Sequence, residues 1–529
     1  MNRLLFTIFF ACCCLSLLCA QDDRCRIHTF TDRDLYLTGE TMHLRVSIST
    51  VGDAQPEQVA YVEIVDRQRL HTQAMMWLSD GVGMADVVLP SSMHSGYYQL
   101  NVYTRSMRNH GSRCCYRAYV PVVNLLQVSR HDHVSFRKVP VDSLALEASA
   151  MENALASSVA MSSVVLTDKK VYSSGEVVTI SVPHDVLASP ERTLSVTPLS
   201  CISDGYYPVH QPEYHQSSDL GFESELYGHL VMARAIEPDS IGTSRLAVVG
   251  KAPHIYDGYV RRDGTILFHT SGYSGSLPVM INGYTADEQP SPVELQSPYA
   301  TILADSLPLL RVVYSEAELS ARSLQAQAEE FVRQGALPDS LPHDPSFMGV
   351  APDYVYDLDE YTRFKTVREI LLEFVRGVQR QKSHGRNQLF TTDPDTGHSA
   401  DCPALVLLDG VPVYDLDAFL DYDARRLKYV HIYTDRFTFG KSFCQGVISF
   451  ITHSGRLANY RLDAGSRLYT YAFPQRSDAG AYAPQWVPSL SDNYSFVAPS
   501  QAGLYQLVIK GCDALGCELR YSAIITVTE

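Results

Sequence analysis

Apolar and polar side chains alternate along a segment near the beginning of the chain. The apolar positions are Met42, Leu44, Val46 and Ile48, and the polar positions between them are His43, Arg45, Ser47 and Ser49. Because successive side chains of a strand point to opposite faces, this period of two predicts a strand with one face on a core. Residues 260–268 predict a β-hairpin with its turn at Asp263 and Gly264. This patterning is typical of a mainly β protein.

Two internal repeats organise the predicted strands. Residues 31–46 recur as residues 167–182, and both copies keep the pattern Thr-Asp-x-x-x-Tyr-x-x-Gly-Glu before a strand. A second repeat links residues 96–103 with residues 503–509, and each copy places a glycine, Gly96 or Gly503, before a strand with an alternating tyrosine. Repeated short strands separated by turns predict tandem β-sandwiches.

Two segments carry helical periodicity. Residues 315–334 predict a helix that begins with a capping-box pattern of Ser315 and Glu318. Residues 366–376 predict a second helix that Gly377 ends. We expect both helices to cover a core. Four prolines mark residues 337–353 as a linker.

The first repeat resembles the opening strand of macroglobulin-type β-sandwiches, which carries a Thr-Asp-Lys-x-x-Tyr-x-x-Gly-Glu pattern. The resemblance covers residues 26–125 and continues more weakly from residue 160. Large macroglobulins that trap proteases carry a Cys-x-Glu-Gln thioester, and this sequence does not contain that tetrapeptide. The resemblance therefore implies a spacer or adhesive sandwich instead of a protease trap.

Residues 361–455 resemble the plug domain of TonB-dependent outer-membrane receptors. Residues 407–413 read Leu-Leu-Asp-Gly-Val-Pro-Val, which is similar to the Val-Asp-Gly-Val-Pro motif of plugs, and residues 446–455 are similar to their closing Gly-Val-Ile-x-Ile-x-Thr-x-x-Gly. The resemblance implies a small α/β domain. The residues after Gly455 are too few for a receptor barrel, so we expect a plug-like domain without a barrel and no transport by this chain alone.

The sequence thus predicts a mainly β fold, with tandem macroglobulin- or Ig-like β-sandwiches and a small α/β plug-like domain. The expected segments are a signal peptide (1–20), a macroglobulin-type sandwich (21–125), a linker (126–159), a second macroglobulin-like domain (160–225), a β-rich domain (226–310), a helix with a Pro-rich linker (311–353), the plug-like domain (354–460) and a C-terminal sandwich-like domain (461–529).

Composition agrees with several folded domains and argues against one class of partner. Of the 529 residues, 45% are hydrophobic and 19% are charged, as in globular proteins too long for one core. The net charge is −16, and the sequence contains no dense Lys/Arg cluster, so we do not expect nucleic-acid binding.

The first 20 residues have the pattern of an export signal, with Arg3 before an apolar run and cleavage expected after Ala20. Lipidation at Cys12 is the alternative. No later stretch has the roughly 18 apolar residues of a membrane-spanning helix. Of the cysteines outside this leader, Cys512 and Cys517 flank a turn-like sequence and are the expected disulfide. We expect an exported protein of the periplasm or outer membrane, with the cell surface as the alternative.

Motifs for catalysis and metal binding are weak. Ser274 lies in Gly-Tyr-Ser-Gly-Ser, one residue out of step with a nucleophile elbow. His184, His210 and His215 are scattered, and the carboxylates between residues 353 and 360 lack the spacing of a calcium loop, so they predict a solvated linker. We expect no catalytic residue, no cofactor and no metal. The alternative is a hydrolase site between the helical segment and the plug-like domain.

The function that follows is a non-catalytic scaffold of a Gram-negative envelope, whose plug-like domain contacts an outer-membrane or periplasmic protein, such as a barrel. The expected contact residues are Asp409, Gly410, Val411, Pro412, Tyr414, Arg436 and Phe437. Free strand edges offer one physical route to such binding. The alternative for these residues is a structural Asp-Gly turn and a solvated loop. The alternative for the whole chain is an adhesin or carbohydrate-binding protein.

Overall fold

The computed structural model of the chain divides into two compact units, residues 1–227, 299–336 and 474–529 in one and residues 228–298 and 337–473 in the other. The predicted signal peptide lies outside the described residues. The described residues are 26–49, 55–111, 113, 115–126, 134–158, 166–182, 192–203, 209–212, 221–239, 241–250, 254–287, 289–335, 347, 349–383, 385–439, 442–476, 486–491, 493–512 and 518–529.

The first unit contains a β-sandwich near the beginning of the chain. One sheet has the strand order β1-β3-β6 and the other the order β2-β8-β7-β4-β5. The strands are β1 (Arg26–Thr31), β2 (Tyr36–Leu37), β3 (Thr41–Ser49), β4 (Val59–Val65), β5 (Leu70–Trp77), β6 (Val82–Val88), β7 (Gly96–Tyr103) and β8 (Tyr116–Val123). The predicted alternation in β3 is confirmed for its apolar face, because Met42, Leu44 and Val46 are fully buried.

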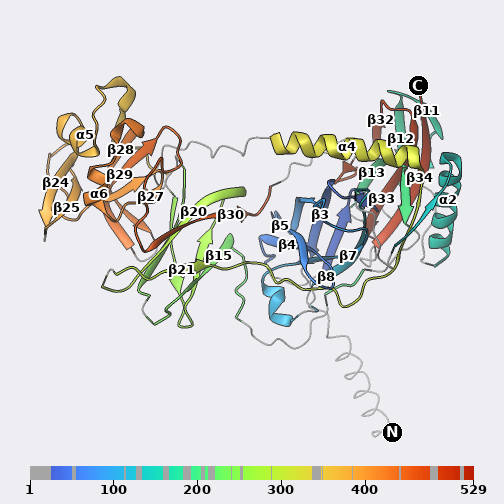
Figure 1. Ribbon diagram of the computed structural model, residues 1–529, viewed down its shortest axis with the longest axis horizontal. Coiled ribbons are helices and arrows are strands. Elements are labelled where there is room, and N and C mark those ends of the chain that lie inside the picture. The colour runs from blue at the N-terminus through green and yellow to red at the C-terminus, as the bar shows by residue number, and fades with distance from the viewer. Residues whose placement is uncertain are drawn as a thin grey trace, which may run out of the picture. The chain divides into compact units, whose positions relative to one another are not determined.

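A second sandwich in the same unit has the same sheet order but is built from two distant parts of the chain. Its sheets have the orders β10-β12-β32 and β11-β34-β33-β13-β31. In Figure 1 the green strands β11, β12 and β13 lie among the red strands β32, β33 and β34. The strands are β10 (Leu166–Thr167), β11 (Val171–Ser173), β12 (Val177–Ser181), β13 (Thr193–Pro198), β31 (Trp486–Val487), β32 (Asn493–Val497), β33 (Gly503–Cys512) and β34 (Glu518–Thr528). Residues 199–485 are thus an insertion between the paired strands β13 and β31.

This discontinuous sandwich differs from the expected domain boundaries. The sequence predicted separate domains at residues 160–225 and 461–529, whereas Val178, Leu194, Leu507 and Ile525 from both segments share one core. Alternation predicts that a strand has a buried face, but it does not specify which strand pairs with it. The order β2-β8-β7-β4-β5 of the first sandwich reappears as β11-β34-β33-β13-β31 in the second. A short connection joins β4 to β5, and the insertion takes its place between the corresponding strands β13 and β31.

The repeated turn forms the same hydrogen-bond network in both sandwiches. In the first copy the Tyr36 hydroxyl donates to Asp32 (2.6 Å), and Asp32 accepts from the backbone N–H of His43 (2.9 Å). In the second copy Tyr172 donates to Asp168 (2.8 Å), which accepts from Thr179 N–H (3.0 Å). The glutamate also accepts from a backbone N–H three residues earlier in each copy. The repeated residues are therefore those that hold the turn together.

A small sheet of order β14-β22-β9 lies between two helices in the first unit. Its strands are β9 (Val134–Lys138), β14 (Cys201–Ser203) and β22 (Leu310–Tyr314), and the helices are α2 (Val141–Ser158) and α4 (Glu316–Gly335). Leu144 of α2 packs with Ile202 and Val313 on one face, while Leu319 of α4 packs with Cys201 and Val312 on the other. The predicted helix at 315–334 is confirmed.

Helix α2 corrects the prediction of a linker at residues 126–159. The structure has an 18-residue helix over most of that segment. Its sequence is rich in Ala, Leu, Glu and Met, which favour helices, but it lacks a strong apolar stripe. The pattern of apolar positions did not predict this helix, because its apolar residues do not form one clear face.

The second unit begins with two four-stranded sheets, of orders β18-β19-β15-β21 and β17-β16-β20-β30. Their strands are β15 (His229–Ala235), β16 (Thr243–Val248), β17 (His254–Asp257), β18 (Tyr259–Val260), β19 (Thr265–Thr270), β20 (Gly275–Tyr284), β21 (Val293–Leu295) and β30 (Ser466–Phe473). The predicted hairpin is confirmed, since β18 pairs with β19 across a turn in which Gly264 has φ +80°.

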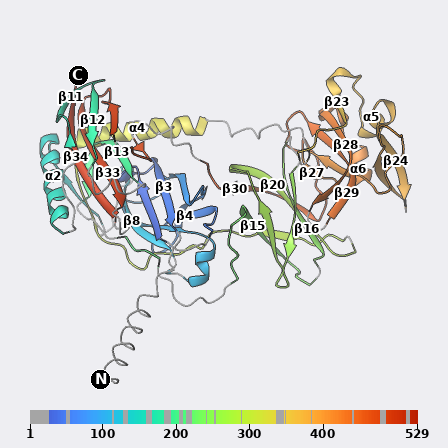
Figure 2. The same ribbon diagram turned by 180° about the vertical axis from the view of Figure 1, so that it is seen from behind.

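The rest of the second unit is the α/β domain, shown in Figure 2. A sheet of order β23-β28-β29-β26-β27 packs against α5 and α6, and β24 pairs with β25 beside it. The elements are β23 (Tyr354–Asp357), α5 (Val367–Glu373), β24 (Val378–Ser383), β25 (Arg386–Thr391), β26 (Leu405–Leu408), β27 (Val411–Pro412), α6 (Leu416–Leu420), β28 (Leu427–Phe439) and β29 (Ser442–Thr452), with short 3₁₀ turns at Leu358–Glu360 and Ala424–Arg426. A third 3₁₀ turn, Ser106–His110, belongs to the first sandwich.

Helix α5 confirms the helix predicted at residues 366–376 but ends earlier. Thr366 is its N-cap and forms a capping box with Glu369. The helix ends at Glu373 because Phe374 leaves helical geometry and stacks on Tyr361, with ring centroids 4.4 Å apart. The predicted fold class is confirmed: the chain is mainly β, with tandem sandwiches and one small α/β domain.

Candidate functional site

The expected contact residues Asp409 and Gly410 form the turn between β26 and β27. Both have positive φ, +46° and +80°, as a two-residue hairpin turn requires. Asp409 is fully buried, and its carboxylate accepts hydrogen bonds from Thr452 N–H, from the Thr452 hydroxyl and from Leu457 N–H, each 2.7 Å long. These contacts agree with the alternative interpretation of Asp409 and Gly410 as a structural turn.

The neighbouring expected contacts are also turned inward. Val411 and Pro412 are buried in β27. Tyr414 is partly buried, and its hydroxyl accepts from Arg245 Nη1 at 3.3 Å and from the amide of Asn282. Tyr414 therefore joins the α/β domain to β16 and β20 of its own unit. The expectation that these side chains form an exposed surface differs from where the structure places them.

The remaining two residues, Arg436 and Phe437, lie on opposite faces of a two-stranded arm. The arm comprises residues 436–439 of β28 and 442–445 of β29, which pair only with each other among the described strands. Phe437 is buried with Phe347 and Cys444. Arg436 is exposed, and its guanidinium carbon lies 4.4 Å from the ring centroid of Phe443. Phe443 is 53% exposed. The sequence does not single out Phe443, because its neighbour Cys444 is also apolar and the pattern does not show which of the two is buried.

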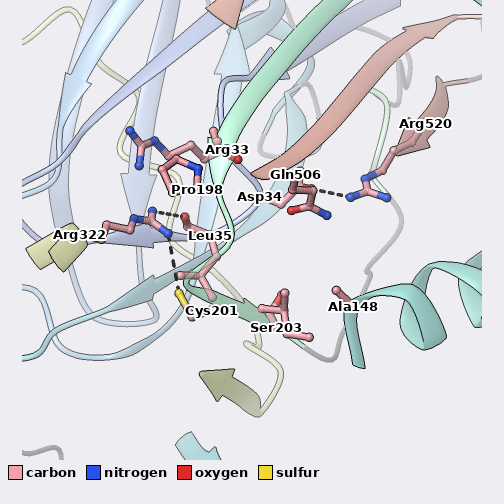
Figure 3. A pocket seen from close by; sticks show the side chains of 12 residues that line it. Arg33, Asp34, Leu35, Ala148, Pro198, Cys201, Ser203, Arg322, Gln506 and Arg520 are labelled. Carbon is pink, nitrogen blue, oxygen red and sulfur yellow. Dashed lines mark hydrogen bonds and ion pairs between the residues drawn. The ribbon is translucent and has the colours of Figure 1, made fainter. Parts of the chain in front are cut away.

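A pocket of about 60 Å³ lies in the first unit, where the first repeated turn meets the second sandwich (Figure 3). It is lined by Arg33, Asp34, Leu35, Ala148, Thr197, Pro198, Cys201, Ile202, Ser203, Arg322, Gln506 and Arg520. This volume is enough for about two water molecules. The sequence interpretation did not identify it, because its residues come from distant segments.

A buried ion-pair network forms one side of the pocket. Arg322 of α4 donates to both oxygens of Glu40 at 2.7 and 2.8 Å, and Arg33 donates to the same carboxylate at 3.1 Å. Burial alone would raise the pKa of Glu40, but Arg322 and Arg33 outweigh it and hold the pKa below its usual range. Arg322 also donates to the carbonyl of Leu35, so the helix is fixed to the turn.

On the other side, Asp34 joins the first sandwich to the second. Its carboxylate lies 2.8 Å from Lys510 Nζ and 2.7 Å from Arg520 Nη2. Burial raises the pKa of Asp34, but the two cations outweigh it and lower the pKa. Because the charges of the network are paired with one another, the arrangement suits a structural joint.

The pocket offers little reactive chemistry. Burial raises the pKa of the Cys201 thiol, so it stays protonated at neutral pH and is a weak nucleophile. Within the described ranges, no group of three or more His, Cys, Asp or Glu side chains is placed to hold a metal ion. Over the same part of the chain, no helix combines the length and apolar character needed to cross a bilayer.

The expected disulfide is only half visible. Cys512 is buried at the end of β33, and Cys517 lies outside the described residues. The Cys512–Cys517 pair therefore stays a prediction. His184 and His215, singled out in the sequence, also lie outside the described residues.

No protein-family model matches the sequence, and no curated protein sequence matches it. Among solved structures, Salmonella alpha-2-macroglobulin reacted with methylamine is 9% identical, with 95% of this chain and 23% of that chain covered at a TM-score of 0.16. Native Escherichia coli alpha-2-macroglobulin is 10% identical, with coverage of 96% and 40% and a TM-score of 0.22. The Escherichia coli adhesin FdeC is 11% identical, with coverage of 55% and 64% and a TM-score of 0.14.

This chain thus spans 23% and 40% of the length of the two macroglobulin structures. At TM-scores and identities this low, the similarities carry no conclusion about its fold or function. Those conclusions rest on the strand pairing and side-chain contacts described above.

Proposed function

We propose that this chain is a non-catalytic interaction protein of a Gram-negative cell envelope, in which rigid sandwiches hold an α/β domain that binds another envelope protein. The observation that carries the proposal is the outer face of the arm, where Arg436 stacks on the half-exposed ring of Phe443. Aromatic residues and arginine are enriched at the energetic centres of protein interfaces. We therefore propose the arm as the contact, with Arg436 kept from the sequence prediction and Phe443 added.

The joint around Glu40 and Asp34 supports a scaffold role. Its paired charges connect α4 and both sandwiches of the first unit. A rigid unit of this kind supports a scaffold role that needs no reactive group. We therefore propose that the chain is not an enzyme. Screening the full chain against generic ester, peptide and glycoside substrates should give no turnover, and saturable turnover with any of them would contradict this part of the proposal.

The binding proposal is tested by site-specific cross-linking in intact cells. A photoreactive phenylalanine analogue in place of Phe443 should form a discrete adduct with an outer-membrane or periplasmic protein. The same analogue in place of Phe331, which is 79% exposed in the first unit, is the matched control. Phe443→Ala and Arg436→Ala should each lower recovery of that partner at least tenfold. Equal adducts at positions 443 and 331, or none at 443, would overturn the proposal.

A second candidate is a surface adhesin or carbohydrate-binding protein. Tyr227 and Tyr259, 80% and 55% exposed, favour it, because exposed aromatic rings can stack on sugars. Protease treatment of whole cells separates the two candidates. Cleavage of the chain on intact cells would favour the adhesin, and protection until the outer membrane is opened would favour the envelope scaffold.

A further inference from the structure

The β24–β25 hairpin carries a concentration of positive charge on an acidic protein. Residues 374–392 contain no Asp or Glu, whereas the whole chain has a net charge of −16. The cations are Arg376, Arg380, Lys382 and Arg386. They alternate with uncharged residues, so the sequence shows no dense basic run. The antiparallel pairing of β24 with β25 brings Arg380, Lys382 and Arg386 onto one short ribbon, and Arg376 lies two residues before β24.

All four of these side chains are exposed. Among the described residues, none of the four is within ion-pair distance of a carboxylate, in contrast to Arg368, which pairs with Asp421 at 3.0 Å. Lys382 interacts electrostatically with Asp417, whose pKa is lowered by a hydrogen bond from Asn387 and, less strongly, by Lys382 and Arg368. The hairpin therefore presents cations that are not paired with a carboxylate of the described residues and that can bind an external anion.

The base of the hairpin is held firmly. Gly377 has φ +82°, and a Cβ there would lie 2.8 Å from the ring of Tyr354, so the chain passes close to β23 at this point. Further along the hairpin Leu389 is buried in the domain core, and Asn387, which lies opposite Lys382 near the tip, donates to Asp417 of α6. The outer edge of β24 pairs with no other strand in the described part of the chain. Strand β25 therefore holds the hairpin to the domain, and β24 forms its outer edge.

An exposed apolar side chain lies close in sequence to the first of these cations. Leu372, near the end of α5, is 78% exposed and lies four residues before Arg376. Figures 1 and 2 both draw α5 and β24 on the same side of the α/β sheet. Cations beside an exposed apolar group are the combination that binds anionic membrane surfaces, where the apolar group enters the interface and the cations meet phosphates.

We propose that the β24–β25 hairpin and the end of α5 bind an anionic lipid surface through its phosphate-bearing headgroups. The proposal rests on the envelope location in the proposed function but not on its protein partner. An acidic protein segment is less well matched, because it would leave Leu372 uncovered. Charges on an edge strand also protect against edge-to-edge aggregation, and the test distinguishes that role.

The test measures co-sedimentation of the full chain with vesicles of phosphatidylglycerol and phosphatidylcholine at low salt. Each cation near such a surface contributes about fivefold to binding, so Arg380→Gln/Lys382→Gln should lower the partition coefficient about 20-fold. Leu372→Ser should lower it several-fold. Binding should vanish with phosphatidylcholine alone and weaken strongly at high salt, where charges are screened. Free glycerol phosphate at matched ionic strength should not compete.

The matched control is Lys169→Gln/Lys170→Gln, which removes two exposed lysines from the first unit and changes the net charge equally. It should change the partition coefficient less than about twofold, since these lysines lie outside the hairpin. Thermal unfolding of all variants verifies that they are folded.

Three results would overturn the proposal. The first is an equal loss of vesicle binding in both double variants, and the second is no binding of the wild-type chain to anionic vesicles. The third is aggregation of the Arg380→Gln/Lys382→Gln variant with its vesicle binding unchanged. Saturable binding to a polyglutamate peptide but not to vesicles would assign the hairpin to an acidic protein instead. If the chain binds vesicles but forms no cross-link at position 443, the proposed protein contact is wrong and the lipid contact stands.

Discussion

Glu40 and Glu176 occupy the same position in the two copies of the repeated turn, yet their surroundings differ. Glu40 is buried and receives Arg322 and Arg33, whereas Glu176 is partly exposed and pairs with Lys169. Breaking a buried ion pair leaves an uncompensated charge in a medium that solvates it poorly, whereas an exposed pair is screened by water. Identical sequence positions therefore carry different energetic weight.

We expect Glu40→Gln to lower the free energy of unfolding by about 3 kcal/mol, because the buried guanidinium of Arg322 loses its ion-pair partner, while Arg33 keeps Asp32. Glu176→Gln, the matched control, should leave the urea midpoint nearly unchanged, because water screens its pair with Lys169. Urea unfolding followed by tryptophan fluorescence measures both, since Trp77 and Trp486 lie in this unit. Equal costs for the two variants would contradict the buried network.

Glu518 of β34 gives the first unit a pH dependence. Burial raises the pKa of Glu518 from 4.5 to about 7. Between these two values the folded protein holds a proton here that the unfolded chain releases, so stability is full below pH 4.5 and falls as the pH rises through 7.

We expect Glu518→Gln to be more stable than the wild type at pH 8, by at most about 3 kcal/mol, because it removes the cost of ionising a buried carboxyl. The difference should shrink to nothing near pH 4. Urea unfolding across this pH range measures it, and Glu360→Gln, an exposed control, should follow the wild-type profile. A variant that is never more stable than the wild type would refute the raised pKa.

At the scale of elements, the two Asp-Gly hairpin turns of the second unit show how context decides the role of one dipeptide. Asp263 is exposed and accepts hydrogen bonds only from the neighbouring Thr265. Asp409 is buried and ties the β26–β27 hairpin to the end of β29 and to Leu457. The Asp409–Gly410 turn thus holds several elements of the α/β domain together.

We expect Asp409→Ala to lower the stability of the α/β domain by about 3 kcal/mol or more, because three buried donors lose their acceptor. Asp263→Ala should cost about 1 kcal/mol or less, since water can replace its contacts. Hydrogen exchange of β26 and β29 against β19 measures the two effects locally. A small effect of Asp409→Ala would show that the hydrogen bonds of Asp409 are dispensable.

At the scale of the whole molecule, the insertion makes the second sandwich depend on two distant segments, residues 166–198 and 486–528. Strand β12 pairs with β32, and β13 pairs with β33 and β31. A chain that ends before β31 would leave β12 without one neighbour and β13 without both.

We expect deletion of residues 477–529 to unfold the segment 166–198, whose amides should then exchange at nearly the rate of an unfolded chain. Strand β4, which pairs within the first sandwich, should stay protected. Continued protection of β12 and β13 in the deleted chain would contradict the discontinuous sandwich and favour the separate domains first expected.

The sequence by itself determined the strands, the turns and the mainly β fold class, because alternation, glycine turns and the repeated Asp-Tyr-Glu pattern act over a few residues. It also held a clue to the split sandwich: the two repeats lie close together in the first sandwich and far apart in the second. Only the tertiary structure decided that residues 167–182 and 503–509 share a core, that Asp409 is buried, that Arg322 reaches Glu40 and that Phe443 is exposed. The reason is physical: local pattern determines which face of an element is apolar, whereas burial and charge pairing depend on which distant element covers that face.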